Sequence, residues 1–186
     1  MKQFFVGFGI VVGILFLIMI ILAGVMFFIV SSNNKDKGDK TTVLPGPDSS
    51  APHALVMYQP TISGTGKTVA DRIAAGLQSA GYEVTVTYPG AHVPSDISKY
   101  AVAAFGSSVY AGQPSAILAQ TMKRFTDYSG IKVALYSIGS ADIAPELDIL
   151  EAGINGADVI TKTKLKAGDK GIADEAYKLG TALAAD

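Results

Sequence analysis

A glycine- and hydroxyl-rich stretch, Ser63 to Thr68, has the residue types and the position of an anion-binding loop. It follows a short apolar run, Ala54 to Tyr58, and precedes an amphipathic run, Val69 to Leu77. In a strand–loop–helix arrangement, it would bring free backbone N–H groups, the positive end of a helix dipole and three hydroxyl groups to one point. Its two glycines let the backbone approach a ligand closely. The pattern therefore favours a bound phosphate dianion over a plain helix start with Thr65 as the N-cap residue.

Two known kinds of phosphate loop are similar to this stretch. In the P-loop of nucleoside triphosphatases, G-x-x-x-x-G-K-[ST], the last three residues match Gly66-Lys67-Thr68, but the first glycine falls on Thr61. That class also needs an apolar strand ending in Asp to hold magnesium, whereas the apolar run Ala101 to Phe105 is followed by Gly-Ser-Ser. The flavodoxin pattern, [ST]-x-T-G-x-T, matches the stretch at every fixed position and is therefore the better match.

Composition excludes several classes of function. The chain has 186 residues and a formal net charge of −1, and from Ala54 onward it carries 11 Lys and Arg against 13 Asp and Glu, a formal charge of −2. This balance argues against a nucleic-acid partner recognised by charge. The absence of Cys excludes disulfides, thiolate metal sites and thiol catalysis. The two histidines, His53 and His92, lie in polar segments near prolines, and we expect solvated loop residues there rather than a metal site.

The N-terminal part of the chain predicts a membrane anchor. Phe4 to Val30 is a run of 27 residues without a charge. As a helix it would be about 40 Å long, enough to cross the roughly 30 Å hydrocarbon core of a bilayer. We expect an uncleaved single-pass anchor over residues 1–30, because the apolar run is longer than that of a signal peptide and offers no clean cleavage site. Lysines at positions 35, 37 and 40, after the span, favour a cytoplasmic domain over the single Lys2 before it.

Two further parts follow the apolar run. Residues 31–52 are polar and contain three prolines, so we expect a flexible linker that cannot bury a core. Residues 53–186 have the size of one domain. Their apolar periodicity predicts strands alternating with helices, and hence an α/β fold with a parallel sheet. The expected strands are 54–58, 83–88, 101–105, 132–136 and 159–166, the last at an edge; the expected helices are 69–77, 96–99, 115–128, 145–154 and 171–184.

The segments after the first, third and fourth expected strands, 59–68, 106–114 and 137–142, are all rich in glycine and serine. In an open parallel sheet, ligands bind beyond the carboxyl ends of the strands at the point where the strand order reverses. These three segments are therefore expected to form the binding site.

The second of these segments strengthens the resemblance to flavodoxins. The apolar strand Tyr100 to Phe105 is followed by Gly106 to Gly112, which matches the flavodoxin pattern G-S-x-V-Y-x-G and precedes a helix. From Ala54 to its end, about 130 residues, the chain resembles a short-chain flavodoxin, here tethered by an N-terminal membrane helix. The resemblance implies a three-layer fold with a five-stranded parallel sheet of order 2-1-3-4-5, FMN as the cofactor and electron transfer as the activity.

The resemblance also implies positions for the cofactor. It places Ser63, Thr65, Gly66 and Thr68 around the FMN phosphate, and it places Ser107 to Gly112 and Ile138 to Ala141 along the isoalloxazine ring. The candidate cofactor-binding residues are thus Ser63, Gly64, Thr65, Gly66, Lys67, Thr68, Ser107, Ser108, Val109, Tyr110, Ala111, Gly112, Gly139 and Ser140. No residue is a candidate general acid or base, because His92 has no evident partner.

Individual residues refine the ring site. Tyr110 is a lone aromatic residue in its loop and is either stacked on a flat ring or packed on the neighbouring helix. Backbone groups of Ala111 and Gly112 could hydrogen-bond a flavin nitrogen and tune its potential. The segment at Gly139 lacks an aromatic residue for the other ring face, so that face is expected to be open to a substrate. Lys67 either contacts the phosphate or points to solvent.

Three functions remain open at this point. The first is a membrane-tethered FMN protein that passes electrons to a redox partner protein or a quinone-like acceptor. The second is a flavodoxin-like interaction module that has lost FMN, suggested by Gln59 to Ile62, which lengthens the loop before Ser63. The third, a nucleotide-binding protein, depends on Gly66-Lys67-Thr68 alone.

Overall fold

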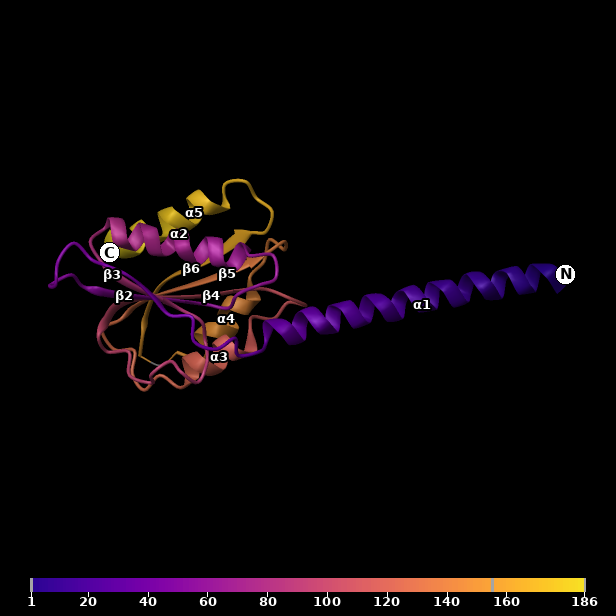
Figure 1. Cartoon of the computed structure of the whole chain (residues 1–186), viewed down its shortest axis with the longest axis horizontal. Coiled ribbons are helices and arrows are strands. Elements are labelled where there is room, and N and C mark those ends of the chain that lie inside the picture. Colours follow the sequence, from indigo (N-terminus) through magenta and orange to yellow (C-terminus); the bar gives the residue numbers. More distant parts are fainter. Residues whose placement is uncertain (1, 155, 186) are drawn as a thin grey trace. The chain divides into compact units, whose positions relative to one another are not determined.

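The computed structural model describes residues 2–154 and 156–185, and it divides the chain into two compact units, 1–32 and 33–186. The first unit is the greater part of helix α1, Lys2–Asn33 (Figure 1). Within α1, the 25 residues Gly9–Asn33 are long and apolar enough to cross a membrane, although a signal sequence near an N-terminus has the same properties. The structure therefore supports a candidate span at the position expected from the sequence.

The second unit contains a six-stranded sheet of order β1-β3-β2-β4-β5-β6. The five strands from β2 to β6 run parallel in the expected order 2-1-3-4-5, and β1 pairs antiparallel with β3 at one edge. The strands are β1 Thr42–Leu44, β2 His53–Tyr58, β3 Glu83–Thr87, β4 Tyr100–Ser108, β5 Lys132–Gly139 and β6 Asp158–Lys166. The five expected strands and their parallel order are thus confirmed. The sheet has six strands instead of five, because β1 is added at one edge.

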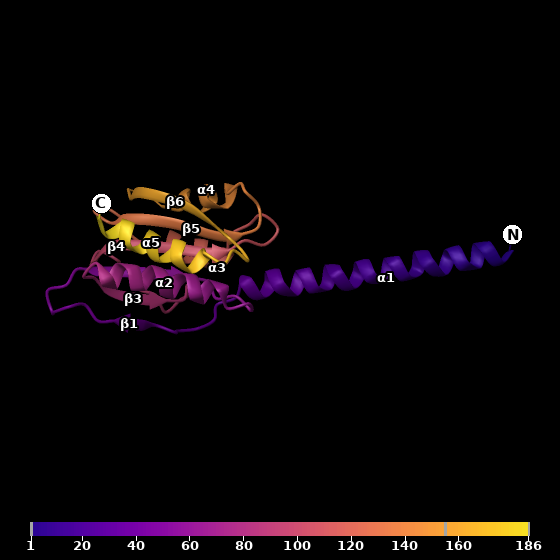
Figure 2. The same cartoon turned by 90° about the horizontal axis from the view of Figure 1, so that it is seen from above.

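Four helices complete the three layers (Figures 1 and 2). Helices α2 and α5 cover one face of the sheet, and α3 and α4 cover the other. The helices are α2 Thr65–Ser79, α3 Ala116–Lys123, α4 Pro145–Glu151 and α5 Ile172–Ala185. The central strands β2, β4 and β5 are apolar on both faces because each face is buried under helices, as parallel sheets require.

The two faces hold separate apolar cores. Ile73 and Leu77 of α2 pack with Leu179 of α5 on one face, while Phe105 of β4 packs with Leu118 of α3 on the other. These apolar stripes had predicted most elements to within a few residues, because burial of one helix face sets a period of 3.6 residues.

Two expected helices differ from the structure. Residues 96–99 form turns instead of a short helix, and α3 ends at Lys123 instead of continuing to Tyr128. Phe125 and Tyr128 have helical spacing, but they are buried in an aromatic cluster with Phe105. The Tyr128 hydroxyl donates to the carbonyl of Met122, which holds the chain in this non-helical path.

Residues 31–52, expected to be a flexible linker, are attached to the domain over much of their length. The Asn33 carbonyl accepts a hydrogen bond from Ser115 Oγ at 2.9 Å, and the Lys35 carbonyl accepts one from Gln59 Nε2 at 3.1 Å. Further along, Thr42–Leu44 forms β1 at the sheet edge beside β3 (Figure 2). The segment buries little apolar surface, so its composition predicted disorder. It is instead held by backbone and short polar groups that satisfy a sheet edge and loop ends.

One contact of this segment replaces a helix cap. Asn34 Oδ1 accepts a hydrogen bond of 2.8 Å from the N–H of Ala116, the first residue of α3. The N-cap residue itself, Ser115, makes no side-chain cap, because its hydroxyl donates to Asn33. A side chain 82 residues away in the sequence therefore satisfies one of the free N–H groups of α3.

We predict that Asn34→Ala lowers the free energy of unfolding of fragment 33–186 by about 1 kcal/mol, the usual cost of a lost N-cap acceptor. Chemical denaturation measures the change. Lys40→Ala, in an exposed part of the same segment, is the control and should change the value by less than about 0.5 kcal/mol. Equal values for the two variants would contradict docking of the segment through Asn34.

Candidate functional site

The loop between β2 and α2 gathers three hydroxyl groups at the start of a helix. Thr61 Oγ1 lies 3.2 Å from Ser63 Oγ, and Ser63 Oγ lies 3.2 Å from Thr65 Oγ1. Gly64, the N-cap residue of α2, has φ 75°, a left-handed conformation that glycine adopts at little cost. Thr65, the N-cap residue of the alternative interpretation as a plain helix start, is instead the first helical residue. The turn therefore presents a compact group of donors to solvent.

This arrangement fits a phosphate dianion. The loop precedes a helix of 15 residues, whose first turn offers unpaired N–H groups and the positive end of the helix dipole. A Cβ atom at Gly66 would lie 3.1 Å from the carbonyl oxygen of Gln59, so a larger residue would disturb the turn. Exposed Thr68, one turn further along α2, places its hydroxyl 3.5 Å from the carbonyl of Gly64.

The side chain of Lys67 has a different partner. Its Nζ donates a hydrogen bond of 2.6 Å to Asp71 Oδ2, four residues along α2, and this bond raises the pKa of the ammonium group. Both side chains are largely exposed. Such a pair on a helix surface contributes only a few tenths of a kcal/mol. Lys67 therefore has the role of an ordinary surface ion pair in this structure.

The segment after β4 divides into a buried part and an exposed turn. Ser107 and Ser108 are buried inside β4, and Ser107 Oγ accepts a hydrogen bond of 3.0 Å from the N–H of Ser115. Gly106 leaves space for the ring of Tyr136, which a Cβ atom would approach to 2.3 Å. The structure thus gives Gly106 and Ser107 packing and positioning roles, which their place in a loop motif had not indicated.

The exposed part is a tight turn with an unusual backbone. Tyr110 and Gln113 exchange both backbone hydrogen bonds, at 3.2 and 3.1 Å. Between them, Ala111 has φ 52° and Gly112 has φ 73°, the two positive values that a type I′ turn requires. The described residues include no other non-glycine residue with positive φ, and such a conformation is unfavourable for alanine. Both central residues of this turn are exposed.

A cavity of about 250 Å³ joins this turn to the loop after β5. Six of the residues expected along the ring line it, from both segments: Val109, Ala111, Gly112, Gly139, Ser140 and Ala141. Tyr110 does not line this cavity; it is half-buried, and burial raises the pKa of its hydroxyl. The hydroxyl loop lies outside the cavity, but the backbone bond from Gln59 N–H to the Gly106 carbonyl, 3.2 Å, brings the two loop origins together.

The same cavity is lined by a charged pair that the sequence did not reveal. Glu146, in the first turn of α4, accepts hydrogen bonds from Lys164 of β6 and from Ser137 Oγ of β5, the latter at 2.6 Å. The side chain of Glu146 is 2% exposed and that of Lys164 is 14% exposed. Burial opposes ionisation of Glu146, but the two hydrogen bonds outweigh it and hold the pKa of the carboxyl below its usual value.

The sequence pattern of β6 predicts a different environment for Lys164. Alternating threonine and lysine over residues 161–166 indicated an edge strand with a charged, solvated face. The strand is indeed at the edge, but α4 covers part of that face and supplies carboxylates to it. Only the position of α4 could show that one of the lysines is buried.

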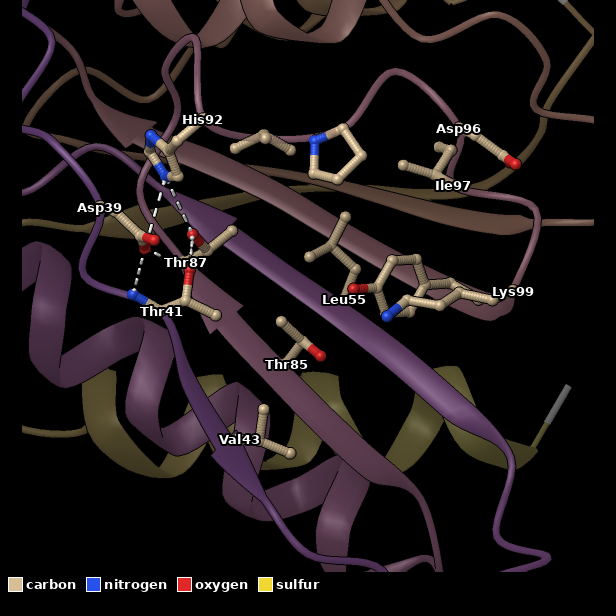
Figure 3. A pocket seen from close by; sticks show the side chains of 13 residues that line it. Asp39, Thr41, Val43, Leu55, Thr85, Thr87, His92, Asp96, Ile97 and Lys99 are labelled. Carbon is tan, nitrogen blue, oxygen red and sulfur yellow. Dashed lines mark hydrogen bonds and ion pairs between the residues drawn. The ribbon is translucent and has the colours of Figure 1, made fainter.

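A second cavity, of about 240 Å³, lies beside β2 and β3, where the expected helix over 96–99 is not formed (Figure 3). At one end, His92 points toward Asp39 and Thr87. His92 Nε2 lies 3.4 Å from Thr87 Oγ1 and 3.8 Å from Asp39 Oδ1, so His92 has the partners that the sequence had not suggested. Both partners face the same ring nitrogen, Nε2.

No group of three or more His, Asp or Glu side chains able to hold a metal ion occurs within the described part of the chain. His53 instead lies 2.9 Å from Glu83 Oε1 across neighbouring strands. This histidine is therefore the first residue of β2 and has a hydrogen-bond partner, where a solvated loop residue was expected.

Comparison with known proteins identifies the fold. No family model and no curated protein matches the sequence. Solved structures do match. Flavodoxin 2 from Bacillus cereus covers 72% of this chain and 98% of its own at 21% identity, with a TM-score of 0.60. The fold is flavodoxin-like. A flavodoxin from the domain Archaea (22% identity; 72% and 96% covered; TM-score 0.51) and the two-electron reduced flavodoxin of Megasphaera elsdenii (20%; 72% and 99%; 0.57) are also similar.

The flavodoxin-like fold places the hydroxyl loop and the cavity at the carboxyl edge of the sheet. The match covers almost the whole of each of these three flavodoxins. The part of this chain outside the match, about a quarter, leaves room for the N-terminal helix and the docked segment. The identities are low, so the likeness establishes the fold and leaves the ligand to be argued from the residues.

The positive φ values of the exposed turn lead to a stability prediction. Gly112→Ala should lower the free energy of unfolding by about 1 kcal/mol, because alanine is strained at φ 73° although nothing lies within 4 Å of the new Cβ. Ala111→Gly should leave the value unchanged or raise it by up to about 1 kcal/mol, because relief of strain offsets the added freedom of the unfolded chain. Denaturant titration of both variants provides the measurement, and a larger loss for Ala111→Gly would contradict the type I′ turn.

Proposed function

We propose that the domain binds FMN at the carboxyl edge of its sheet and acts in electron transfer. The observation that carries this proposal is that two features lie where the order of the strands reverses. The hydroxyl cluster starts α2 directly after β2, and the cavity between the 109–112 and 139–141 loops follows the neighbouring strands β4 and β5. An anion site at the same sheet edge as a partly apolar cavity suits a phosphate ester that carries an aromatic ring.

Different residues would bind the phosphate and the ring of FMN. Ser63, Thr65 and the first N–H groups of α2 would hold the phosphate through charge-assisted hydrogen bonds. The turn at Ala111 and Gly112 would offer backbone groups to the ring edge, and Gly139 would lie on the other side of the cavity. FMN, when bound, supplies one- and two-electron chemistry, and the protein supplies position and electrostatics.

The two alternatives have less support. The extra loop residues Gln59 to Ile62 had suggested a lost cofactor, but Gln59 is buried and continues the strand, and the hydroxyl group still forms beyond it. The nucleotide-binding alternative depended on Lys67, which is paired with Asp71 on the exposed surface of α2. Retained donor geometry therefore favours a bound FMN over both.

The location and partners belong to the same proposal. The apolar helix α1 would anchor the chain in a membrane, with the domain on the cytoplasmic face, because the lysines follow the span. Exposed Ile62 and Ile143, in the loops after β2 and β5, would give a redox partner protein or a quinone-like acceptor an apolar contact at the edge that binds the ring. The charge balance of the domain argues against nucleic acid as a partner.

The proposal is tested by comparing the dissociation constants of FMN and riboflavin. Ser63→Ala combined with Thr65→Val removes two hydroxyl donors to a dianion, each worth about 1.5–3 kcal/mol. The FMN dissociation constant should rise at least about 100-fold, whereas riboflavin, which has no phosphate, should lose far less. Absorbance and fluorescence titrations measure both constants.

Thr181→Val provides the matched control, because its hydroxyl donates to the Lys178 carbonyl within α5 and does not belong to the loop. Both ligands should bind this variant as they bind the unmodified protein. Equal losses of FMN and riboflavin in the double variant would exclude the loop as the phosphate site. A protein that binds neither flavin would refute the function itself.

The membrane anchor is tested by fractionation of cells that produce the full chain. We expect the intact chain to stay with the membranes after an alkaline wash, and its domain to resist a protease added to intact cells. Lysis before protease treatment should expose the domain to digestion. A soluble, N-terminally shortened domain would show instead that α1 is a cleaved signal sequence, and digestion without lysis would reverse the proposed membrane face.

A further inference from the structure

Three lysines on one face of β6 each pair with acidic residues from α4 or the loop before it. Lys162 lies 2.8 Å from both Asp148 and Glu151, and Lys166 lies 3.4 Å from Asp142. Lys164, between them, pairs with Glu146. The pairs of the outer two lysines are solvated, whereas in the central pair Glu146 is buried and Lys164 is partly buried, and both line the cavity formed by the 109–112 and 139–141 segments.

The surroundings of Lys164 place its charge against this cavity. A Cβ atom at Gly139 would lie 3.0 Å from Lys164 Nζ, so the ammonium group fits beneath a loop residue that itself lines the cavity. Lys164 is also more exposed than Glu146, 14% against 2%. The positive end of the pair is therefore the end nearer to the open space, and the negative end is held deeper by Ser137 Oγ.

A pair of this kind is a weak contribution to stability. Desolvation of two charges cancels most of their attraction, and buried pairs can often be replaced by apolar residues without loss. Lys164 pairs in register with Ser137 and lies between Lys162 and Lys166 on the same face of β6, so its surroundings on the sheet are polar. A buried cation in the wall of a cavity does, however, interact strongly with any charge that forms inside that cavity, because little water screens it.

We propose that Lys164, positioned by Glu146, is an electrostatic determinant of the ring site that favours the reduced, anionic flavin over the oxidised, neutral one. The inference rests on the proposed function, because it requires a flavin ring in this cavity. Two electrons from a redox partner and one proton from solvent leave the ring with a single negative charge. Lys164 attracts that charge and Glu146 offsets part of the attraction.

The pair allows a test with effects of opposite sign. Lys164→Met removes the cation and should lower the ratio of affinities for reduced and oxidised FMN about tenfold, which corresponds to a two-electron midpoint potential about 30 mV more negative. Glu146→Gln leaves Lys164 without its counter-charge and should shift the potential by a similar amount in the positive direction. Lys164→Arg keeps the charge and should retain most of the original potential. The full-length chain in detergent, loaded with FMN, is used throughout.

Lys162→Met is the matched control. It removes a lysine from the same strand that pairs with carboxylates of the same helix, but Lys162 does not line the cavity. The two-electron midpoint potential of FMN bound to this variant should stay unchanged. Thermal melting of each variant reports any loss of stability separately. A purely structural role for Lys164 would lower the melting temperature and leave the potential where it was.

The outcomes separate this inference from the proposed function. Opposite shifts for Lys164→Met and Glu146→Gln support it. Unmodified protein that binds FMN, together with variants that keep the same potential or shift it in the same direction, overturns the inference and leaves the proposed function intact. Unmodified protein that binds no flavin overturns both. If Lys164→Met fails to fold, the direction of the Glu146→Gln shift decides.

Discussion

The reversal of strand order at β2 is the constraint on which the site depends. The strand pairs with β3 on one side and with β4 on the other, so the connections after β2 and β4 leave the sheet on opposite faces. The bond from Gln59 N–H to the Gly106 carbonyl marks the point beyond which the two chains diverge. Beyond it lie the start of α2, with its hydroxyl cluster, and the turn that lines the cavity. The start of α2 and this turn can therefore both contact a ligand at this edge without any rearrangement of the core.

The docked segment after α1 meets the same edge. Its Lys35 carbonyl is bound by the side chain of Gln59, and its Asn33 carbonyl by Ser115 at the start of α3. Both partners directly adjoin the loops of the candidate site. The segment therefore helps to fix the loop origins, and its loss would affect the site as well as the stability of the sheet edge.

The sequence predicted the features that depend on local periodicity and missed those that depend on distant partners. Continuous apolar runs located β2, β4 and β5, and the spacing of Ser63, Thr65 and Thr68 located the hydroxyl turn, because both patterns are short in sequence. The strand β1 could not be predicted, since it buries little and is defined by pairing with β3. The burial of Lys164 depends on where α4 lies, and the loss of the 96–99 helix depends on contacts outside that segment.

The central claim, one flavin site at the carboxyl edge of β2, β4 and β5, is tested most directly by a heteronuclear NMR titration of isotope-labelled fragment 33–186 with FMN. We expect saturable 1:1 binding of FMN, with amide shifts concentrated at residues 63–68, 109–112 and 139–141. Shifts confined to the cavity beside His92, or no shifts at millimolar FMN, would contradict it.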